Sequence, residues 1–270
     1  MDIISELLYE YDPIKRRKNF TKRQAKEIKK YIEEKLEPEE EEMIKAYQEI
    51  KKRYQQTIGR VLQLEDDGRL FPLPRQDGKT DRIYITGPSE SGKSTYAANF
   101  IKRFKIMYPD KKFFIFSRLT QDEVLDKLNP IRVSLDESYL EDPLNLEDLS
   151  HSIVLFDDID TIGNKHVREK IKDLRDDCLE TGRHNDIAVI SVSHVALGNK
   201  NTKMSLNESN SLVLFPKAAT KYHIESILTR YIGLDKHQIN YIYNNIKSRW
   251  IAIYRDYPMF ILHENGAYFP

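Results

Sequence analysis

The sequence predicts an α/β fold in which a mostly parallel sheet carries helices on both faces and is preceded by an α-helical N-terminal arm. From Arg82 onward, short β-rich runs alternate with helical stretches, and these runs are apolar without a period of two, as expected for strands buried on both faces. The first 80 residues instead hold few glycines and many charges, with apolar positions at helical spacing. We therefore expect an arm and linker over 1–80 and one compact domain over 81–270.

The arm is expected to contain two helices. Thr21 followed by Gln24 is a capping-box pattern that predicts a helix beginning near Lys22, and Pro38 ends it because proline has no amide donor. A second helix is expected from Pro38, since the acidic run 39–42 suits the positive end of a helix dipole. Its apolar stripe requires a partner surface and consists of Tyr47, Ile50, Tyr54, Ile58 and Val61.

The arm also carries a basic segment. Nine lysines and arginines lie between Ile14 and Lys30, opposed only by Glu27. They could engage phosphate backbones, although a solvated helix face that pairs with the acidic run 39–42 is the favoured reading. Two glycines and two prolines between Asp66 and Lys79 predict a linker.

Charge and cysteine content limit the classes of function. Lysine plus arginine and aspartate plus glutamate both total 43, so there is no global attraction to nucleic acid or membrane, and any polyanion site must be local. The single cysteine, Cys178, cannot form an intrachain disulfide and is expected to be a buried or inert thiol. No apolar run is long enough to cross a bilayer and the N-terminus lacks a secretory leader, which predicts a soluble protein that is not secreted.

The predicted strands of the parallel sheet are short. They cover 83–86, 113–117, 153–156, 187–192 and 212–215. The C-terminal segment from Trp250 to Phe269 has two more strand-like runs, 250–254 and 259–262, and a turn signal at Asn265-Gly266. This segment predicts antiparallel strands that close one edge of the sheet.

A phosphate-binding loop follows the first of these strands. The pattern G-x-x-x-x-G-K-[ST] stands between strand 83–86 and a helical stretch, where its backbone amides and the helix N-terminus can hold phosphate. Lys93 is expected to reach the β- and γ-phosphates, and Ser94 to ligate Mg²⁺. The residues expected to bind ATP are Gly87, Pro88, Ser89, Glu90, Ser91, Gly92, Lys93, Ser94 and Thr95.

A pair of carboxylates follows the strand 153–156. Such a buried strand delivers Asp157 and Asp158 to the top of the sheet, as in a Walker B motif. Asp157 is expected to hold Mg²⁺ through water, and Asp158 to orient the attacking water. Asp160 is expected to cap the helix that begins near Asn164 rather than to act in the chemistry.

A third group of residues points to a family. Arg183 precedes the apolar strand 187–192, and a small hydroxyl residue and a polar residue, Ser193 and His194, follow that strand, with His194 eleven positions after Arg183. This pattern resembles the FtsK/HerA superfamily of DNA-pumping P-loop ATPases. With the segments 113–118 and 249–262, the chain looks most like the viral genome-packaging ATPases of poxviruses and giant viruses, relatives of which occur in virophages. The resemblance covers Arg82 to Pro270 and implies a RecA-like P-loop core.

The resemblance also implies roles for these residues. Arg183 would be an arginine finger that acts on ATP bound to a neighbouring subunit, and Ser193 and His194 would sense the γ-phosphate. The superfamily commonly has Thr-Gln at these two positions, so His194 departs from it. The alternatives are that Arg183 only neutralises a helix C-terminus and that His194 is an ordinary strand-end histidine.

The implied activity is ATP hydrolysis by a homo-oligomeric ring that moves double-stranded DNA into a capsid, in the virion or the cytoplasm of the infected cell. The arm would dock on a neighbouring subunit, a capsid vertex or an internal membrane protein. An AAA-type remodelling ATPase, a small-molecule phosphotransferase and a non-hydrolysing nucleotide-binding scaffold are the alternatives. The candidate DNA contacts lie in loops beyond the strand ends and are Lys165, His166, Arg168, Lys200 and Lys203.

Overall fold

The computed structural model describes residues 61–63, 70–194 and 200–270. The two predicted arm helices, the basic segment and most of the apolar stripe lie outside the described residues. The chain divides into two compact units, Met1–Thr57 and Ile58–Pro270, of which the second contains everything described below. Val61 was expected at the end of the helical stripe, but it begins strand β1 (Val61–Gln63), whose backbone pairs antiparallel with the last strand of the chain.

The described part of the chain forms a sheet of ten strands in the order β1-β10-β9-β8-β7-β2-β6-β5-β3-β4. The strands from β7 to β4 pair in parallel, and those from β1 to β8 pair antiparallel, as does β8 with β7. The fold is thus the predicted mostly parallel, RecA-like α/β core with antiparallel strands closing one edge. The strands are β2 Arg82–Thr86, β3 Lys112–Ser117, β4 Ile131–Arg132, β5 Ser152–Asp157, β6 Ile187–Ser193, β7 Ser211–Leu214, β8 Ile251–Tyr254, β9 Phe260–His263 and β10 Gly266–Tyr268.

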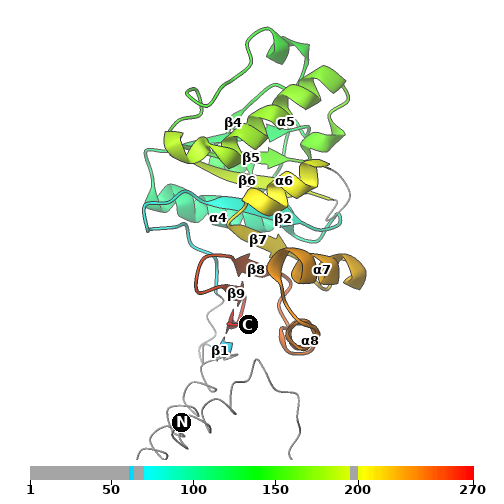
Figure 1. Ribbon diagram of the computed structural model, residues 1–270. Coiled ribbons are helices and arrows are strands. Elements are labelled where there is room, and N and C mark those ends of the chain that lie inside the picture. The colour runs from blue at the N-terminus through cyan, green and yellow to red at the C-terminus, as the bar shows by residue number, and fades with distance from the viewer. Residues whose placement is uncertain (1–60, 64–69, 195–199) are drawn as a thin grey trace, which may run out of the picture. The chain divides into compact units, whose positions relative to one another are not determined.

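Helices cover both faces of the sheet because successive strand residues point to opposite sides. On β2, Ile83 and Ile85 pack in one core cluster with the helix that follows the phosphate loop, whereas Tyr84 packs in the cluster of the opposite face. Figure 1 shows α5, α6 and α7 on one side of the sheet and α4 behind it. The helices are α4 Lys93–Met107, α5 Lys165–Glu180, α6 Lys200–Glu208, α7 Lys221–Ile227 and α8 Lys236–Asn245.

Short helical turns occupy several of the connections. Four of them are 3₁₀ helices, at Asp126–Leu128, Glu137–Leu140, Ile159–Thr161 and Gly182–Asn185, and a π-helical turn at Leu228–Ile232 continues α7. The sequence runs did not indicate β4, whose two residues extend the parallel edge beside β3.

Helix α5 shows how one helix meets the sheet. Its buried positions, which include Val167, Ile171, Leu174 and Cys178, recur at spacings of three and four, and the rest of the helix faces solvent. Asn164 caps it, since its side chain accepts hydrogen bonds from the amides of His166 and Val167 at 2.9 and 3.3 Å.

Two predictions made for this region have different outcomes. Asp160 was expected to cap α5, but Asn164 stands directly before the helix, and Asp160 forms an ion pair with Lys172 at 2.6 Å instead. Cys178 is fully buried as expected, and burial raises the pKa of its thiol to about 12. A thiol so protonated is a poor nucleophile, which agrees with the inert reading.

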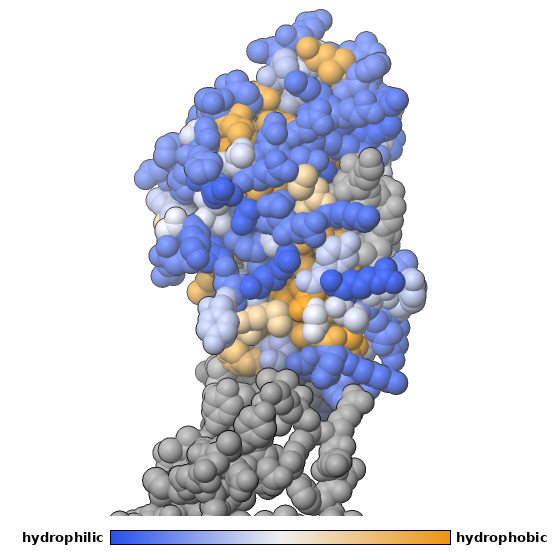
Figure 2. Space-filling model, in the orientation of Figure 1, coloured by the Kyte–Doolittle hydropathy of each residue, from blue (hydrophilic) through white to orange (hydrophobic). Residues whose placement is uncertain are grey.

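Most of the surface seen in Figure 2 is hydrophilic, and apolar side chains show in a few separate groups. This distribution follows from helices that turn one polar face outward. Across 61–63, 70–194 and 200–270, no helix has the length and apolar character needed to span a membrane.

Candidate active site

The polar residues of the candidate site gather at one edge of the sheet because three parallel strands end there. β2 ends at Thr86 and leads into the phosphate loop, and Thr86 lies opposite Ser193 at the end of β6. β6 in turn pairs with β5, whose last residue, Asp157, lies opposite Val192. The loop after β2, the residues after β6 and the carboxylates after β5 therefore stand side by side.

The phosphate loop depends on its glycines. A Cβ atom added at Gly87 would lie 2.8 Å from the Ser91 hydroxyl and 3.0 Å from the ring of Phe215, so only glycine fits without displacement. Gly92 has φ 110°, a conformation that other residues rarely adopt, and its carbonyl accepts the bond from the amide of Tyr96 that opens α4. The N-terminus of α4 therefore lies at the end of the loop, where its amides can face a bound anion.

Lys93 lies across this loop. Its Nζ donates to the carbonyls of Gly87 and Pro88, both at 2.9 Å, and is 3.0 Å from Nδ1 of His194. The side chain is buried, and burial lowers the pKa of its ammonium group, against the opposing effect of the two nearby carboxylates. When nucleotide binds, its phosphate oxygens would replace these partners of Lys93.

His194 connects the loop to the carboxylate pair. Its Nδ1 meets Lys93, and its Nε2 contacts Oδ2 of Asp158 in an ion-pair geometry. Asp158 itself has a left-handed backbone with φ 49°, which aspartate tolerates better than most residues and which often marks a functional position. Burial raises the pKa of Asp158, while the proximity of His194 and Lys93 opposes that rise.

Asp157 is the more buried carboxylate, only 7% exposed. Burial, together with the charge of Asp158, raises the pKa of Asp157 to about 6. The hydroxyl of Ser117, at the end of β3 and opposite Asp157 in the register, donates to its Oδ2 at 3.2 Å. The sequence reasoning used 113–117 as a strand and 113–118 as a family feature and missed this contact, although a hydroxyl residue at the end of an apolar strand was visible.

The residues present fit ATP and Mg²⁺. The Ser91 hydroxyl is buried without a hydrogen-bond partner among the described residues, and the loop offers amides and an ammonium group to an anion. In those residues, no three or more His, Cys, Asp and Glu side chains cluster as a protein-only metal site. Mg²⁺ ordinarily takes one or two protein oxygens plus phosphates and water, and Ser94 and Asp157 are the residues that would hold it.

The remaining predicted residues lie on the surface around the site or, in the case of Arg183, away from it. Ser89, Glu90 and Thr95 are exposed on the loop and the first turn of α4, and Ser193 is half-buried at the end of β6. Arg183 precedes β6, at the opposite end of this seven-residue strand, so about 20 Å separates it from the site. Its NH1 donates to the carbonyl of Glu180 at 2.8 Å, at the C-terminus of α5.

Arg249 begins the segment 249–262, which the sequence reasoning used for the strands and the family resemblance, and no role was predicted for it. Its Nε donates to the Ser91 carbonyl at 2.8 Å and its NH2 to the Glu90 carbonyl at 2.6 Å, both in the phosphate loop. The contact joins positions 158 and 159 residues apart, which no local motif could signal.

The basic residues that were candidates for DNA contact lie on α5 and α6, the helices that follow β5 and β6. Lys165 and His166 are exposed at the start of α5, and Lys165 pairs with Glu169 at 3.8 Å. Arg168 donates to the carbonyl of Ile162 at 2.6 Å. Lys203 is exposed on α6, and the side chain of Lys200 lies outside the described part of the structure.

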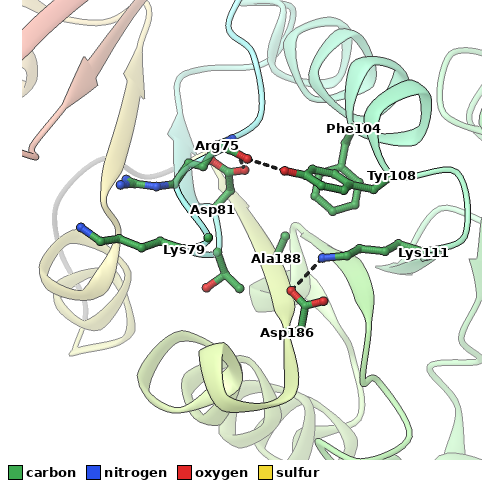
Figure 3. A pocket seen from close by; sticks show the side chains of 10 residues that line it. Arg75, Lys79, Asp81, Phe104, Tyr108, Lys111, Asp186 and Ala188 are labelled. Carbon is green, nitrogen blue, oxygen red and sulfur yellow. Dashed lines mark hydrogen bonds and ion pairs between the residues drawn. The ribbon is translucent and has the colours of Figure 1, made fainter.

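A small cavity of about 130 Å³ lies at the opposite end of the sheet, near the start of β2 and β6. Figure 3 shows Asp81 among its lining residues, with Lys111 bonded to Asp186 and Tyr108 bonded to the Arg75 carbonyl. Asp81 is buried and accepts a hydrogen bond from the Arg75 amide at 3.1 Å. The cations that line this cavity are Arg75, Lys79 and Lys111, and each forms an ion pair with a carboxylate. Their charges are therefore already balanced, so the cavity is not an alternative phosphate site.

Comparison with models of known protein families gives no match. In sequence, the chain is 46% identical over 203 residues to "Uncharacterized protein V3" of the Sputnik virophage, which covers 74% of this chain and 81% of the relative.

Several solved structures are remotely similar to this chain. One is B204, the DNA-packaging ATPase from Sulfolobus turreted icosahedral virus, with TM-score 0.48, 12% identity, and 70% of this chain and 99% of that chain covered. Another is the genome-packaging NTPase B204 of Sulfolobus turreted icosahedral virus 2 with AMP, with TM-score 0.47, 12% identity, and 69% and 98% covered. The identity to the virophage protein over most of both chains is decisive, and the chain belongs to the family of the Sputnik virophage protein V3, in keeping with the predicted resemblance to virophage proteins.

Proposed function

We propose that this chain is an ATPase that assembles as a homo-oligomeric ring and moves double-stranded DNA into a viral capsid. The observation that carries the ATPase part is the bridge made by His194 between Lys93 of the phosphate loop and Asp158 after β5. A loop that only bound nucleotide would not need a carboxylate linked to its lysine. The bridge joins Lys93, the proposed phosphate ligand, to Asp158, the proposed water-orienting group, in one unit of contacting side chains.

The loop residues would bind and orient the nucleotide. The amides between Gly87 and Gly92 and the N-terminus of α4 would hold the β-phosphate, and Lys93 would exchange its carbonyl partners for phosphate oxygens. Ser94 and Asp157 would hold Mg²⁺, which neutralises phosphate charge when bound. Ser117 would keep the Asp157 carboxylate turned toward the metal position.

His194 and Ser193 would report the γ-phosphate to the catalytic carboxylate. When Lys93 turns to phosphate, Nδ1 of His194 loses its partner, and the histidine is free to shift together with the Asp158 contact at Nε2. Asp158 would then orient the attacking water. The alternative in which His194 is an ordinary strand-end histidine is not favoured by a ring that contacts both functional groups.

Arg183 would act across a subunit boundary. It lies at the opposite end of β6 from Lys93, so it is too distant to stabilise the nucleotide of its own chain. This placement supports an arginine finger supplied to a neighbour in a ring. The bond to Glu180 equally fits a residue that only neutralises the end of α5, and the two readings predict different outcomes in mixed assemblies.

The DNA part rests on the superfamily resemblance of the sequence and on local basic residues in a chain of zero net charge. Lys165, Arg168 and Lys203 would contact the phosphate backbone near the site edge. Residues 1–80 would provide docking to a capsid vertex or an internal membrane protein.

The deciding experiment measures ATP hydrolysis by the full chain with and without duplex DNA over a range of salt concentrations. We expect duplex DNA to raise the rate at low salt and the stimulation to fade as salt rises, because phosphate contacts release counterions. The variant Lys93→Ala serves as the control for contaminating ATPases and should be inactive in all conditions.

The outcomes separate the alternatives. Hydrolysis that ignores DNA at every salt concentration would contradict the translocase and favour a phosphotransferase. ATP binding without any hydrolysis would favour the scaffold.

A further inference from the structure

We infer that Arg249 is a positioning residue that holds the phosphate loop in its anion-binding conformation, an inference that rests on the proposed nucleotide site. Arg249 lies two residues before β8, a strand in the antiparallel part of the sheet, and its exposed side chain reaches the loop after β2. Its guanidinium group donates two hydrogen bonds to successive carbonyls, those of Glu90 and Ser91, at 2.6 and 2.8 Å. Such a two-pronged contact fixes the orientation of the groups it binds.

The orientation of these carbonyls determines where the loop amides point. In a trans peptide the carbonyl and the amide on either side of the bond point in opposite directions. Because the carbonyls of Glu90 and Ser91 point to Arg249, the amides of Ser91 and Gly92 point away from it, toward the inside of the loop. The Ser91 amide donates a hydrogen bond to the carbonyl of Pro88 there, at 3.3 Å. Inward amides are what a phosphate requires of such a loop.

The loop needs this support because its backbone is unusual. Glu90 has φ 63° and Gly92 has φ 110°, both in the left-handed region. Glu90 carries a side chain, so its conformation is costly unless neighbouring groups hold it. At Gly92, an added Cβ would lie 3.3 Å from Nε of Arg249, so the glycine also leaves room for the guanidinium group.

Arg249 is itself held in place. Its own amide and the Ser248 hydroxyl both lie 3.3 Å from a carboxylate oxygen of Glu264, in the turn between β9 and β10. The next residue, Trp250, is buried and packs edge-on against Tyr96 of α4 at a centroid distance of 5.1 Å. The backbone of Arg249 is therefore fixed to the helix that follows the loop, and its side chain acts as a brace from the antiparallel strands to the nucleotide site.

The test compares Arg249→Ala and Arg249→Lys with wild type in the full-length chain, by the KM and kcat of ATP hydrolysis and by ATP binding. We expect Arg249→Ala to raise the KM and the dissociation constant of ATP about tenfold, the effect of losing charged hydrogen bonds, while kcat changes much less. Arg249→Lys, with a single ammonium group, should lie between the two. Added guanidinium ion at a non-denaturing concentration should partly restore ATP affinity to Arg249→Ala.

Arg255 provides a matched control. It also donates to backbone carbonyls, those of Leu206, Asn207 and Ser209, but away from the phosphate loop. Arg255→Ala should lower the melting temperature and leave the KM for ATP unchanged. Wild-type ATP affinity in Arg249→Ala, or an equal loss of affinity in Arg255→Ala, would overturn the inference, and Arg249→Lys decides it if the alanine variant does not fold.

The same measurements separate this inference from the proposed function. If the wild-type chain binds ATP but does not hydrolyse it, the ATPase proposal fails. The ATP affinities of the Arg249 variants still test whether Arg249 positions the phosphate loop. If the wild-type chain binds no ATP, both fail.

Discussion

At the scale of single residues, the contact of His194 with both Lys93 and Asp158 is the most informative feature of the molecule. Each of the three side chains belongs to a different segment, and the buried Lys93 and half-buried Asp158 are both paired through His194. Burial shifts the pKa values of Lys93 and Asp158 toward their neutral forms, and their mutual proximity opposes both shifts. A group of titratable residues with such opposing influences is typical of a site of chemistry.

The first prediction concerns Asp158. Asp158→Asn should retain ATP binding and lose about a hundredfold or more in turnover, because an amide cannot polarise the attacking water. ATP binding and steady-state hydrolysis measure the two effects. Asp160→Asn, which changes a nearby carboxylate paired with Lys172, should keep wild-type turnover. Equal turnover in Asp158→Asn and wild type would remove Asp158 from the catalytic step.

The second prediction concerns Asp81, which is 3% exposed and whose pKa burial raises from 3.8 to about 6. The folded chain thus holds this proton more tightly than the unfolded chain, so the contribution of Asp81 to stability is full below pH 4 and is lost as pH rises through about 6. Asp81→Asn cannot ionise, and its Oδ1 can still accept the bond from the Arg75 amide. Relative to wild type, its free energy of unfolding should therefore rise by up to about 3 kcal/mol between pH 4 and pH 7.

Urea unfolding of both proteins across this pH range measures the difference. Asp77→Asn is the control, since hydrogen bonding to Arg75 lowers the pKa of Asp77 to about 2 and its titration falls below the range. A difference between Asp81→Asn and wild type that does not change with pH would show that Asp81 is not a buried carboxyl group of raised pKa.

At the scale of elements, the site is a property of where three strands end. β2, β6 and β5 are parallel neighbours, so their C-terminal residues share one edge, although β5 precedes β6 in the chain. The phosphate loop has little conformational freedom, because Gly87 has no room for a side chain and Arg249 binds the carbonyls of Glu90 and Ser91.

The third prediction tests this steric limit. Gly87→Ala places a Cβ 2.8 Å from the Ser91 hydroxyl and 3.0 Å from the buried ring of Phe215, so the loop must move. We expect the KM for ATP to rise about tenfold and the free energy of unfolding to fall by about 1–3 kcal/mol. Gly163→Ala, whose Cβ would meet no atom within 4 Å, should match wild type in both measurements. A Gly87→Ala variant with unchanged KM would mean that the loop accommodates the methyl group.

At the scale of the whole molecule, the two ends of the parallel strands carry different features. The nucleotide site lies at their C-terminal ends, and Arg183 and the cavity near Asp81 lie at the N-terminal ends of β6 and β2. A ring would bring the Arg183 end of one subunit to the nucleotide of the next. Activity per subunit should then depend on assembly.

The fourth prediction mixes two inactive variants, Arg183→Ala and Lys93→Ala. Arg183→Ala should bind ATP normally and hydrolyse it about a thousandfold more slowly, the effect of losing an arginine finger. A mixed ring contains junctions where an intact Lys93 site faces an intact Arg183, so mixing should restore part of the activity. Hydrolysis rates of the mixture, alongside a sizing measurement that verifies mixed assemblies, give the readout. If mixed rings form and remain inactive, Arg183 acts within its own subunit or only neutralises the end of α5.

The sequence by itself determined the features that depend on neighbouring residues. The apolar runs predicted β2, β3 and every strand from β5 to β9, but not the two-residue β4. Burial on both faces of a parallel sheet leaves a local mark in composition, which a strand as short as β4 does not carry. The phosphate loop and the carboxylates after β5 were likewise visible, since each is one short segment between a strand and a helix. Val61 and Asp160 were misjudged because strand pairing with β10 and a competing cap at Asn164 outweighed the local pattern.

Only the tertiary structure decided which distant side chains meet. The contacts of Arg249 with the loop, of Ser117 with Asp157, and of His194 with Lys93 join segments between 40 and 159 positions apart in the chain. These distances along the chain carry no periodic signal, because the strand order and register that close them arise from packing of the whole sheet. The loop could thus be recognised from its own residues, but its brace and its link to the carboxylates depend on how the rest of the chain folds around it.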